Sequence, residues 1–208
     1  MELDHVTFAG PPFEEELAIV ASLPDNLTSL LRQVNGFILF EGGLHVRGVC
    51  THPEWHSLSS VLVGPRALHA LYPALLPSDV PFAQDCVADQ YILRERKVHK
   101  LEAETGELSF MDLSLPEFLS AVQAHPVEVL GMQPLLRHRQ EGGALKPGQV
   151  LHVYPPFCTK EAANGVSLKA VPVQEAISYL SELSRVVSSL PDGRQIQITV
   201  VKNERPGT

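Results

Sequence analysis

The middle of the chain alternates short apolar runs with turn-forming residues, and this pattern restricts the fold more than any other feature of the sequence. Four such runs follow one another between residues 80 and 113, reading VPFA, QYILRE, KVHKLEA and ELSFMDL. Turn residues separate them: Asp85 with Asp89, the charged stretch near Arg96, and Thr105-Gly106. Apolar-rich runs joined by such brief turns are typical of adjacent antiparallel strands. The sequence therefore predicts a meandering antiparallel sheet.

Helical patterns lie before and after these strands. The segment 23–36 repeats leucine at helical spacing and ends in Asn35-Gly36, which is a C-terminal stop signal. In the segment 114–125, Ser114 and Glu117 have the spacing of a capping box, and one apolar face follows them. The other expected elements are a helix at 11–22, a hairpin at 37–49, a short helix or turn at 65–73, and a helix at 127–139 that Gly131 and Pro134 would break.

The stretch EGGALKPG at 141–148 is rich in loop-forming residues and is the clearest internal boundary. Beyond it the sequence predicts strands at 149–157, 166–171 and 194–202, and a helix at 172–190. Helices first, strands in the middle and a helix after them indicate an α+β fold. We therefore expect an antiparallel meandering β-sheet with helices packed on one side, in a domain at 13–140, plus a C-terminal α/β extension at 141–208 packed on the same domain.

The charge of the chain narrows the classes of partner. The 208 residues include 16 basic and 24 acidic side chains, which gives a net charge of −8 with histidine neutral. Binding to nucleic acid needs a basic face that neutralises phosphates, so we expect no nucleic-acid partner. An acidic body suits a basic protein partner, although mild acidity also serves solubility alone.

The cysteines and the N-terminus indicate a compartment. Cys50, Cys86 and Cys158 are far apart in the sequence and form no Cys-x-x-Cys pair, which favours reduced, buried thiols. The N-terminus is acidic where a signal peptide would be basic. No apolar run approaches the roughly 20 residues that cross a bilayer. The sequence thus predicts a cytoplasmic protein that does not bind membranes.

Histidines in and near the stretch CTHPEWH are the strongest metal-ligand candidates. His52 and His56 are four residues apart, a spacing that would place both on one face of a helix. However, Pro53 follows the first histidine where a zincin has glutamate, and proline disfavours a helix interior. The Pro-Cys-x-x-Cys half of a zinc deaminase is also absent from the sequence. Even with His45 and Cys50 added to the set, we expect no metal site.

Asp85 and Asp89 have two interpretations: a carboxylate pair for acid–base or divalent-ion chemistry, or residues that shape a hairpin turn. Aspartate in a turn usually bonds to its own backbone two residues on, so we favour the turn. The sequence contains no Gly-x-Ser-x-Gly and no glycine-rich phosphate loop. We therefore expect no catalytic residue and no cofactor. Trp55, the only tryptophan, is either a core residue or an interface anchor.

Several short sequence motifs follow one another between residues 23 and 119. They are Leu23-Pro24, Asn35-Gly36, Gly43-Leu44, Pro81-Phe82-Ala83 with Asp85, Asp89-Gln90, Val98, the ETGEL turn, and the helix from Ser114 to Leu119. Together they resemble the SUKH superfamily, whose best-known member is the yeast cell-wall regulator of the Smi-one/Knr-four type. The segment after Gly142 resembles the extension of a longer bacterial branch. One position differs from the family pattern, which usually has glycine where this chain has Ala88. An alanine there would be strained if its φ is positive.

This resemblance implies an α+β domain without catalytic machinery, and bacterial relatives of the immunity type bind and neutralise toxins. The sequence therefore predicts a non-catalytic protein-binding module, with a basic toxin such as a nuclease as its partner, or a related regulatory scaffold. The residues expected to contact the partner are Trp55, Asp85, Asp89, Glu102, Glu104 and Glu107. The alternative is a small metal-dependent hydrolase that uses His45, His52, His56, Asp85 and Asp89.

Overall fold

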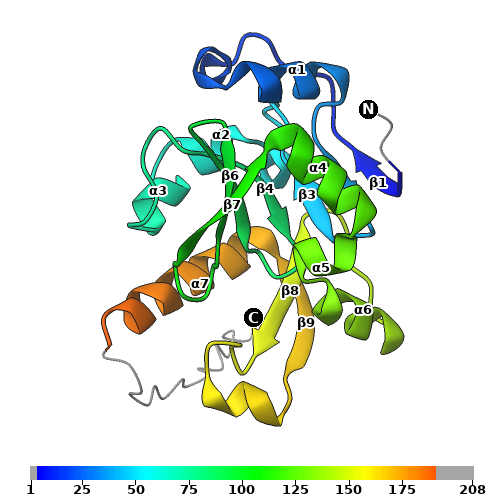
Figure 1. Ribbon diagram of the computed structural model, residues 1–208, viewed down its shortest axis with the longest axis vertical. Helices are drawn as coiled ribbons and strands as arrows, with labels where there is room; N and C mark the ends of the chain where they lie inside the picture. The colour runs from blue at the N-terminus through cyan, green and yellow to red at the C-terminus, as the bar shows by residue number, and fades with distance from the viewer. Residues whose placement is uncertain (1–3, 191–208) are drawn as a thin grey trace, which may run out of the picture.

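Figure 1 shows the computed structural model, which describes residues 4–190. Seven strands form one antiparallel sheet, in which spatial order follows sequence order. They are β1 (Val6–Ala9), β2 (Phe37–Leu39), β3 (Leu44–Val46), β4 (Val80–Asp85), β5 (Gln90–Arg94), β6 (Lys97–Leu101) and β7 (Leu108–Ser114). The chain has the expected α+β fold, with an antiparallel meander, helices on one side and a C-terminal α/β unit.

Helices connect and cover these strands. They are the 3₁₀ turns η1 (Ala18–Ser22) and η2 (Glu54–His56) and the helices α1 (Asp25–Gln33), α2 (Ser59–Leu62), α3 (Leu68–Leu71), α4 (Leu115–Ala124), α5 (Pro126–Leu130) and α6 (Gln133–Gln140). The C-terminal unit contains β8 (Gln149–Tyr154), η3 (Lys160–Asn164), β9 (Ser167–Pro172) and α7 (Val173–Ser188). Within residues 4–190, no helix is long and apolar enough to cross a bilayer.

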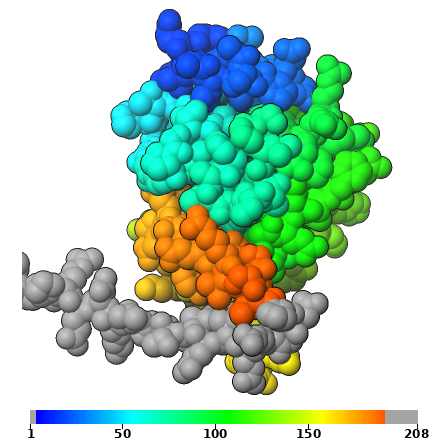
Figure 2. Space-filling model, turned by 90° about the vertical axis from the view of Figure 1, so that its left-hand side faces the viewer, coloured from blue at the N-terminus to red at the C-terminus, as the bar shows by residue number. Residues whose placement is uncertain are grey.

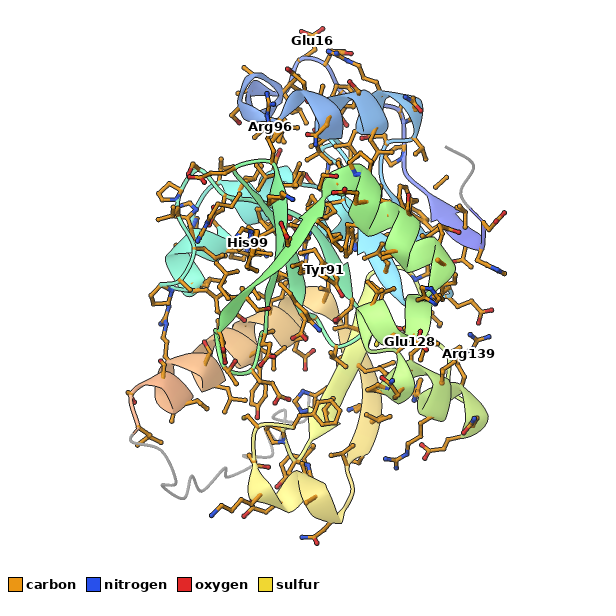
Figure 3. All side chains as sticks on the ribbon, viewed as in Figure 1. Glu16, Tyr91, Arg96, His99, Glu128 and Arg139 are labelled. Atoms are coloured by element: carbon orange, nitrogen blue, oxygen red, sulfur yellow. The ribbon has the colours of Figure 1, made fainter. Side chains whose placement is uncertain are left out.

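The core forms where α4 packs against the sheet. The predicted capping box is present, because the carboxylate of Glu117 accepts hydrogen bonds from the backbone N and the hydroxyl of Ser114 at 2.7 and 2.6 Å. The ring of Phe118 packs edge-on against Phe82 at 5.8 Å and lies 4.7 Å from Tyr91, which is near the centre of the molecule in Figure 3. One buried cluster contains Phe82, Tyr91, Leu93, Val98, Leu101, Phe118 and Leu119, which places the core between the sheet and the capped helix.

The C-terminal unit packs on the same domain, as expected. The backbone N of Leu151 in β8 donates to the carbonyl of Cys86 in the β4–β5 turn at 2.7 Å, and the Leu151 side chain belongs to the main core. A second cluster joins Ala88 and Ala103 of the first unit to the buried face of α7. The side view in Figure 2 shows α7, in orange, directly below the segment that contains α2 and α3, in teal.

The N-terminal segment differs from the prediction. The helix expected at 11–22 is reduced to η1, because contacts with distant parts of the chain hold the earlier residues in irregular backbone and a turn. The Asn35 amide donates to the carbonyls of Pro11 and Pro12 at 2.8 and 3.1 Å, and the Glu14 carboxylate accepts two hydrogen bonds from Thr51. Glutamates that look like a helix N-terminus therefore make tertiary contacts instead.

Two further differences concern the ends of elements. The short and largely exposed β1 has no clear apolar pattern and was not expected, and it extends the first unit from residue 13 back to Val6. The helix expected at 127–139 is broken at Gly131, as predicted, into α5 and α6, whereas Pro134 lies in the first turn of α6, where its missing N–H is harmless. The strand expected at 194–202 lies outside the described residues.

Replacing Phe118 with alanine should lower the free energy of unfolding by about 3–5 kcal/mol, because the missing ring leaves a cavity in the core. Chemical denaturation followed by circular dichroism measures this change. Phe110 in β7 is the matched control, since its side chain is 60% exposed and its replacement should cost less than about 0.5 kcal/mol. A loss below about 1 kcal/mol in Phe118→Ala would contradict the packing of α4.

Candidate functional site

The β4–β5 turn has the geometry that the sequence predicts. The Asp85 carboxylate accepts hydrogen bonds from the backbone N of Val87 at 3.0 Å and of Asp89 at 3.1 Å, which is an Asx-turn with one further bond. Ala88 has a φ of 71°, so alanine occupies the left-handed region that favours glycine. The alanine that differs from the SUKH pattern is therefore a strained residue, and the hydrogen bonds of the Asp85 turn hold it in place.

A buried ionic cluster lies beneath this turn. The Lys100 ammonium from β6 is 3.0 Å from the Asp89 carboxylate and 3.5 Å from Oδ2 of Asp85, which has no hydrogen bond. Burial, and then the charge of Asp89, raise the pKa of Asp85 to about 8. Asp85 is fully buried, so it shapes the turn and does not reach a partner directly.

Three of the other predicted carboxylates, Asp89, Glu102 and Glu104, line a hollow between the β6–β7 turn and the loop after β8. We call it the acidic hollow; its volume is about 290 Å³, and it is lined by Val87, Asp89, Glu102, Glu104, Thr105, Phe157 and Cys158. Glu102 and Glu107 are exposed, and Glu107 lies on the same turn. Phe157 is 47% exposed, so one exposed aromatic side chain lines the acidic hollow, and the 40% exposed Tyr154 lies three residues earlier in the sequence.

Glu104 has a structural task in this hollow. Its carboxylate accepts hydrogen bonds from the backbone N of Phe157 at 3.0 Å and of Cys158 at 2.8 Å. Burial, the largest effect, raises the pKa of Glu104, while these two N–H groups oppose the increase. Glu104 therefore ties the β6–β7 turn to the C-terminal unit, and no local pattern indicates this contact between residues more than fifty positions apart.

Trp55 lies apart from the acidic hollow. It is half-buried, with its ring 5.1 Å from Phe8 and 5.2 Å from His45. A Cβ on Gly148 would come within 2.9 Å of the indole, so this glycine lets the segment 144–150 pack directly on the tryptophan. Of the two roles open for Trp55, packing between the two units is the one its contacts support.

The three histidines do not converge on one point. His45 Nε2 lies 2.9 Å from His56 Nδ1, and His56 Nε2 lies 2.9 Å from the carbonyl of Asn35, while His52 is exposed. Burial is the largest effect that lowers the pKa of both His45 and His56. Within residues 4–190, no group of three or more His, Cys, Asp or Glu side chains is placed to hold a metal ion.

A buried cation that the sequence analysis did not single out lies next to these histidines. Arg47 is 1% exposed and donates to the carbonyl of Pro81 at 2.8 Å and to the side-chain oxygens of Gln84 at 2.5 Å and Gln90 at 2.7 Å. Burial lowers the pKa of Arg47 to about 9, so it remains charged at neutral pH. Its only sequence signal is an arginine directly after an apolar strand.

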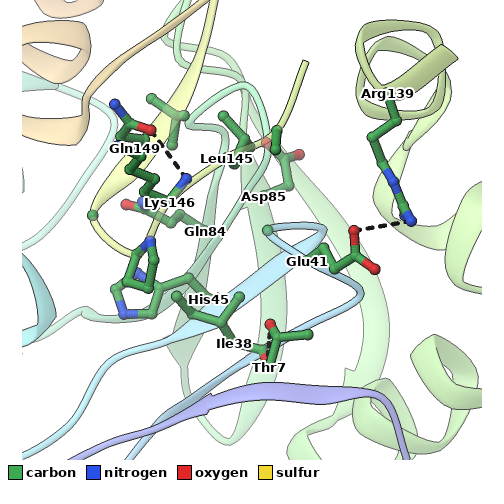
Figure 4. A pocket seen from close by; sticks show the side chains of 15 residues that line it. Thr7, Ile38, Glu41, His45, Gln84, Asp85, Arg139, Leu145, Lys146 and Gln149 are labelled. Carbon is green, nitrogen blue, oxygen red and sulfur yellow. Dashed lines mark hydrogen bonds and ion pairs between the residues drawn. The ribbon is translucent and has the colours of Figure 1, made fainter. Parts of the chain in front are cut away.

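Arg47, Gln84, Gln90 and the two buried histidines form a buried polar layer on one face of the sheet. A polar cleft opens beside this layer, between the sheet and the segment 144–150 (Figure 4). Its volume is about 160 Å³. His45 and Gln84 form part of its lining, and an ion pair between Glu41 and Arg139 at 2.9 Å lies at its edge. Asp85 also belongs to the lining, but its side chain lies on the opposite face of β4 from Gln84 because strand residues alternate.

Comparison with known proteins establishes the fold and leaves the family open. No family model and no curated protein matches the chain. The crystal structure of Atu4351 from Agrobacterium tumefaciens is similar to it, with a TM-score of 0.50 and 12% sequence identity over 85% of each chain. At this level of identity, the likeness shows a common fold and nothing about activity.

The stability of the protein should decrease as the pH rises through the range in which Asp85 ionises. A carboxyl whose pKa is higher in the folded state stabilises that state below its unfolded value, near 4, and this contribution is lost up to about pH 8. Asp85→Asn should therefore gain stability relative to the wild type between pH 5 and pH 9, by at most about 1.4 kcal/mol per pH unit. Denaturant titrations at several pH values measure this difference.

Asp112→Asn is the matched control, because it removes an exposed carboxylate that pairs with Lys97 at 3.0 Å on the surface. This control should follow the pH dependence of the wild type. A constant difference in stability between Asp85→Asn and wild type from pH 5 to pH 9 would show that Asp85 does not change its ionisation there.

Protein purified without added metal should contain no stoichiometric zinc, because His45 and His56 bond to each other and His52 is not part of their group. Elemental analysis of the purified protein tests this. One equivalent of zinc that disappears in His52→Ala would instead support the metal-dependent hydrolase.

Proposed function

We propose that this protein is a non-catalytic binding module that recognises a basic protein partner through the acidic hollow. One observation carries the proposal: the exposed carboxylate of Glu102 and the exposed ring of Phe157 line the same hollow, and the exposed Glu107 follows on the same turn as Glu102. Aromatic side chains supply much of the binding energy in protein interfaces, while carboxylates at the rim attract and orient a basic partner.

The rigidity of this surface also supports the proposal. Glu104 fixes the backbone at Phe157 and Cys158, and Asp89 accepts a hydrogen bond from the backbone N of Ala103 at 2.8 Å. The two segments that carry the exposed side chains are therefore held together before any partner arrives. Such preorganisation reduces the entropy that association costs.

The resemblance to the SUKH superfamily favours the immunity type, in which the partner is a toxin and a nuclease would supply the basic surface. A regulatory scaffold that binds a cellular protein would use the same surface. The metal-dependent hydrolase has no specific observation in its favour, because the contacts of His45, His56 and Asp85 are all internal. We therefore place the protein among those that act by occluding a partner.

The test is the association rate with a purified basic toxin encoded beside this chain, measured by stopped flow or surface plasmon resonance. Exposed charges are screened beyond a Debye length of about 8 Å at physiological salt. Raising the salt should therefore slow association by about tenfold or more and change dissociation much less. An association rate that is independent of salt would contradict the electrostatic part of the proposal.

Charge reversal separates the acidic hollow from the rest of the acidic surface. The double variant Glu102→Lys and Glu107→Lys should slow association as high salt does, whereas Glu104 stays unchanged because its reversal would break the contact with Phe157. The control is Glu16→Lys with Glu128→Lys, which changes the net charge equally at two exposed sites, both labelled in Figure 3, that are not part of the lining of the hollow. Equal effects of the two double variants would show that only the total charge matters.

Phe157→Ala tests the anchor independently of charge. Loss of a central aromatic contact should raise the dissociation rate by a factor corresponding to about 2 kcal/mol and leave the salt dependence of association unchanged. Leu136, which is 36% exposed on α6, gives a control for the loss of a surface apolar side chain. Unchanged dissociation in Phe157→Ala would remove the aromatic residue from the interface.

A further inference from the structure

The polar cleft of Figure 4 has no part in the function proposed above, yet its floor consists of side chains whose hydrogen-bonding roles are fixed. His45 of β3 and Gln84 of β4 are direct cross-strand partners. Side chains of such a pair lie on the same face of the sheet and are close neighbours. Both residues are almost fully buried, and both line the cleft.

The histidine pair fixes what His45 offers to the cleft. A backbone carbonyl only accepts hydrogen bonds, so His56 must carry its proton on Nε2, which faces the carbonyl of Asn35. The neutral His56 ring then accepts at Nδ1, and His45 must donate to it from Nε2. Since burial keeps His45 neutral, its Nδ1 has no proton and is a hydrogen-bond acceptor.

Arg47 fixes the amide of Gln84 in the same way. A guanidinium only donates hydrogen bonds, so the Gln84 oxygen must face Arg47, and the Gln84 Nε2 is the opposite end of the amide. Neither this nitrogen nor Nδ1 of His45 has a hydrogen-bond partner among residues 4–190, and neither is among the fully enclosed polar atoms. The floor of the cleft thus presents one donor and one acceptor side by side.

From this arrangement we infer that the cleft binds a small, uncharged, planar molecule with a cyclic amide edge, in which a C=O and an N–H are adjacent. The carbonyl of such a ligand accepts from Gln84 Nε2, and its N–H donates to His45 Nδ1. A cavity of about 150 Å³ holds one benzene-sized ring, and this cleft has about 160 Å³. Lactams, pyridones and pyrimidinones have the required edge and size.

The mouth of the cleft favours an uncharged ligand. Glu41 and Arg139 neutralise each other at its edge, and the only other charged side chain of the lining besides Asp85 is the exposed Lys146. The apolar part of the lining includes Ile38, the cross-strand neighbour of His45, and Leu145 from the covering segment. A flat ring would contact these two side chains above and beside the polar pair.

The test uses the full chain with uracil as the probe, whose ring carries adjacent C=O and N–H groups. Titration followed by two-dimensional NMR of the Gln84 side-chain amide should show saturable, one-to-one binding. The matched probe is 1,3-dimethyluracil, which has the same ring and carbonyls but no N–H, and it should bind at least about tenfold more weakly because the His45 acceptor is left unpaired. Absence of saturable binding by uracil would overturn the inference and indicate that the cleft holds only water.

Two isosteric variants separate the cleft from the buried layer beneath it. Gln84→Glu keeps an oxygen toward Arg47 but replaces the donor in the cleft by a second acceptor, so uracil binding should fall by about tenfold or more. Gln90→Glu adds the same charge beside Arg47, but the Gln90 amide faces the carbonyl of Ala88 and not the cleft, so binding should persist. Calorimetric titration of both variants measures the affinity, with thermal unfolding as a check of the fold.

Equal binding of uracil and its dimethyl derivative, or uracil binding that Gln84→Glu leaves unchanged, would also overturn the inference. Neither result bears on the acidic hollow, which lies on another surface of the protein.

Discussion

The centre of the sheet is organised around the buried guanidinium of Arg47. Removing a cation from water costs several kcal/mol, and here three oxygens from β4 and β5 offset this cost without a bonded carboxylate in the described part of the chain. Because the group only donates, it fixes the orientation of every amide that it contacts. Loss of the guanidinium would leave the oxygens of Gln84, Gln90 and Pro81 without this partner in the interior.

The hydrogen bonds of Arg47 affect two other parts of the structure. Through Gln84, it determines which end of an amide faces the polar cleft. Through Gln90, whose Nε2 donates to the carbonyl of Ala88 at 2.6 Å, it supports the strained β4–β5 turn. That turn positions Asp89, whose carboxylate holds Ala103 at the start of the β6–β7 turn and so shapes the acidic hollow. The polar residues between Pro81 and Leu108 therefore shape the fold first, and they position the exposed side chains of the proposed binding surface.

Features encoded by local sequence were predictable. The meander follows from alternating apolar runs and turn residues, and the capping box at Ser114 and Glu117 depends on four consecutive residues. The Asx-turn at Asp85 is equally local. The residues of the core were also predictable, because alternate residues of a strand share one face and that face must be buried against the capped helix.

Features that depend on distant partners could not be predicted in this way. The irregular segment at 11–17 is set by Asn35 and Thr51, which override the helical signal of its glutamates. Glu104 looks like a free turn carboxylate until Phe157 and Cys158 are placed beside it. Arg47 and the His45–His56 pair acquire their roles only when three strands and the segment before α2 come together. Each of these is a long-range contact of a polar group.

Hydrogen–deuterium exchange of the complex with the proposed basic partner tests the central claim, recognition of a partner through the acidic hollow, most directly. The account predicts new protection of backbone amides at 102–107 and 154–158, the two segments that form the hollow. Amides of α1 and α6 should exchange as they do in the free protein. Protection confined to α1 or α6, with the two hollow segments unchanged, would contradict the account.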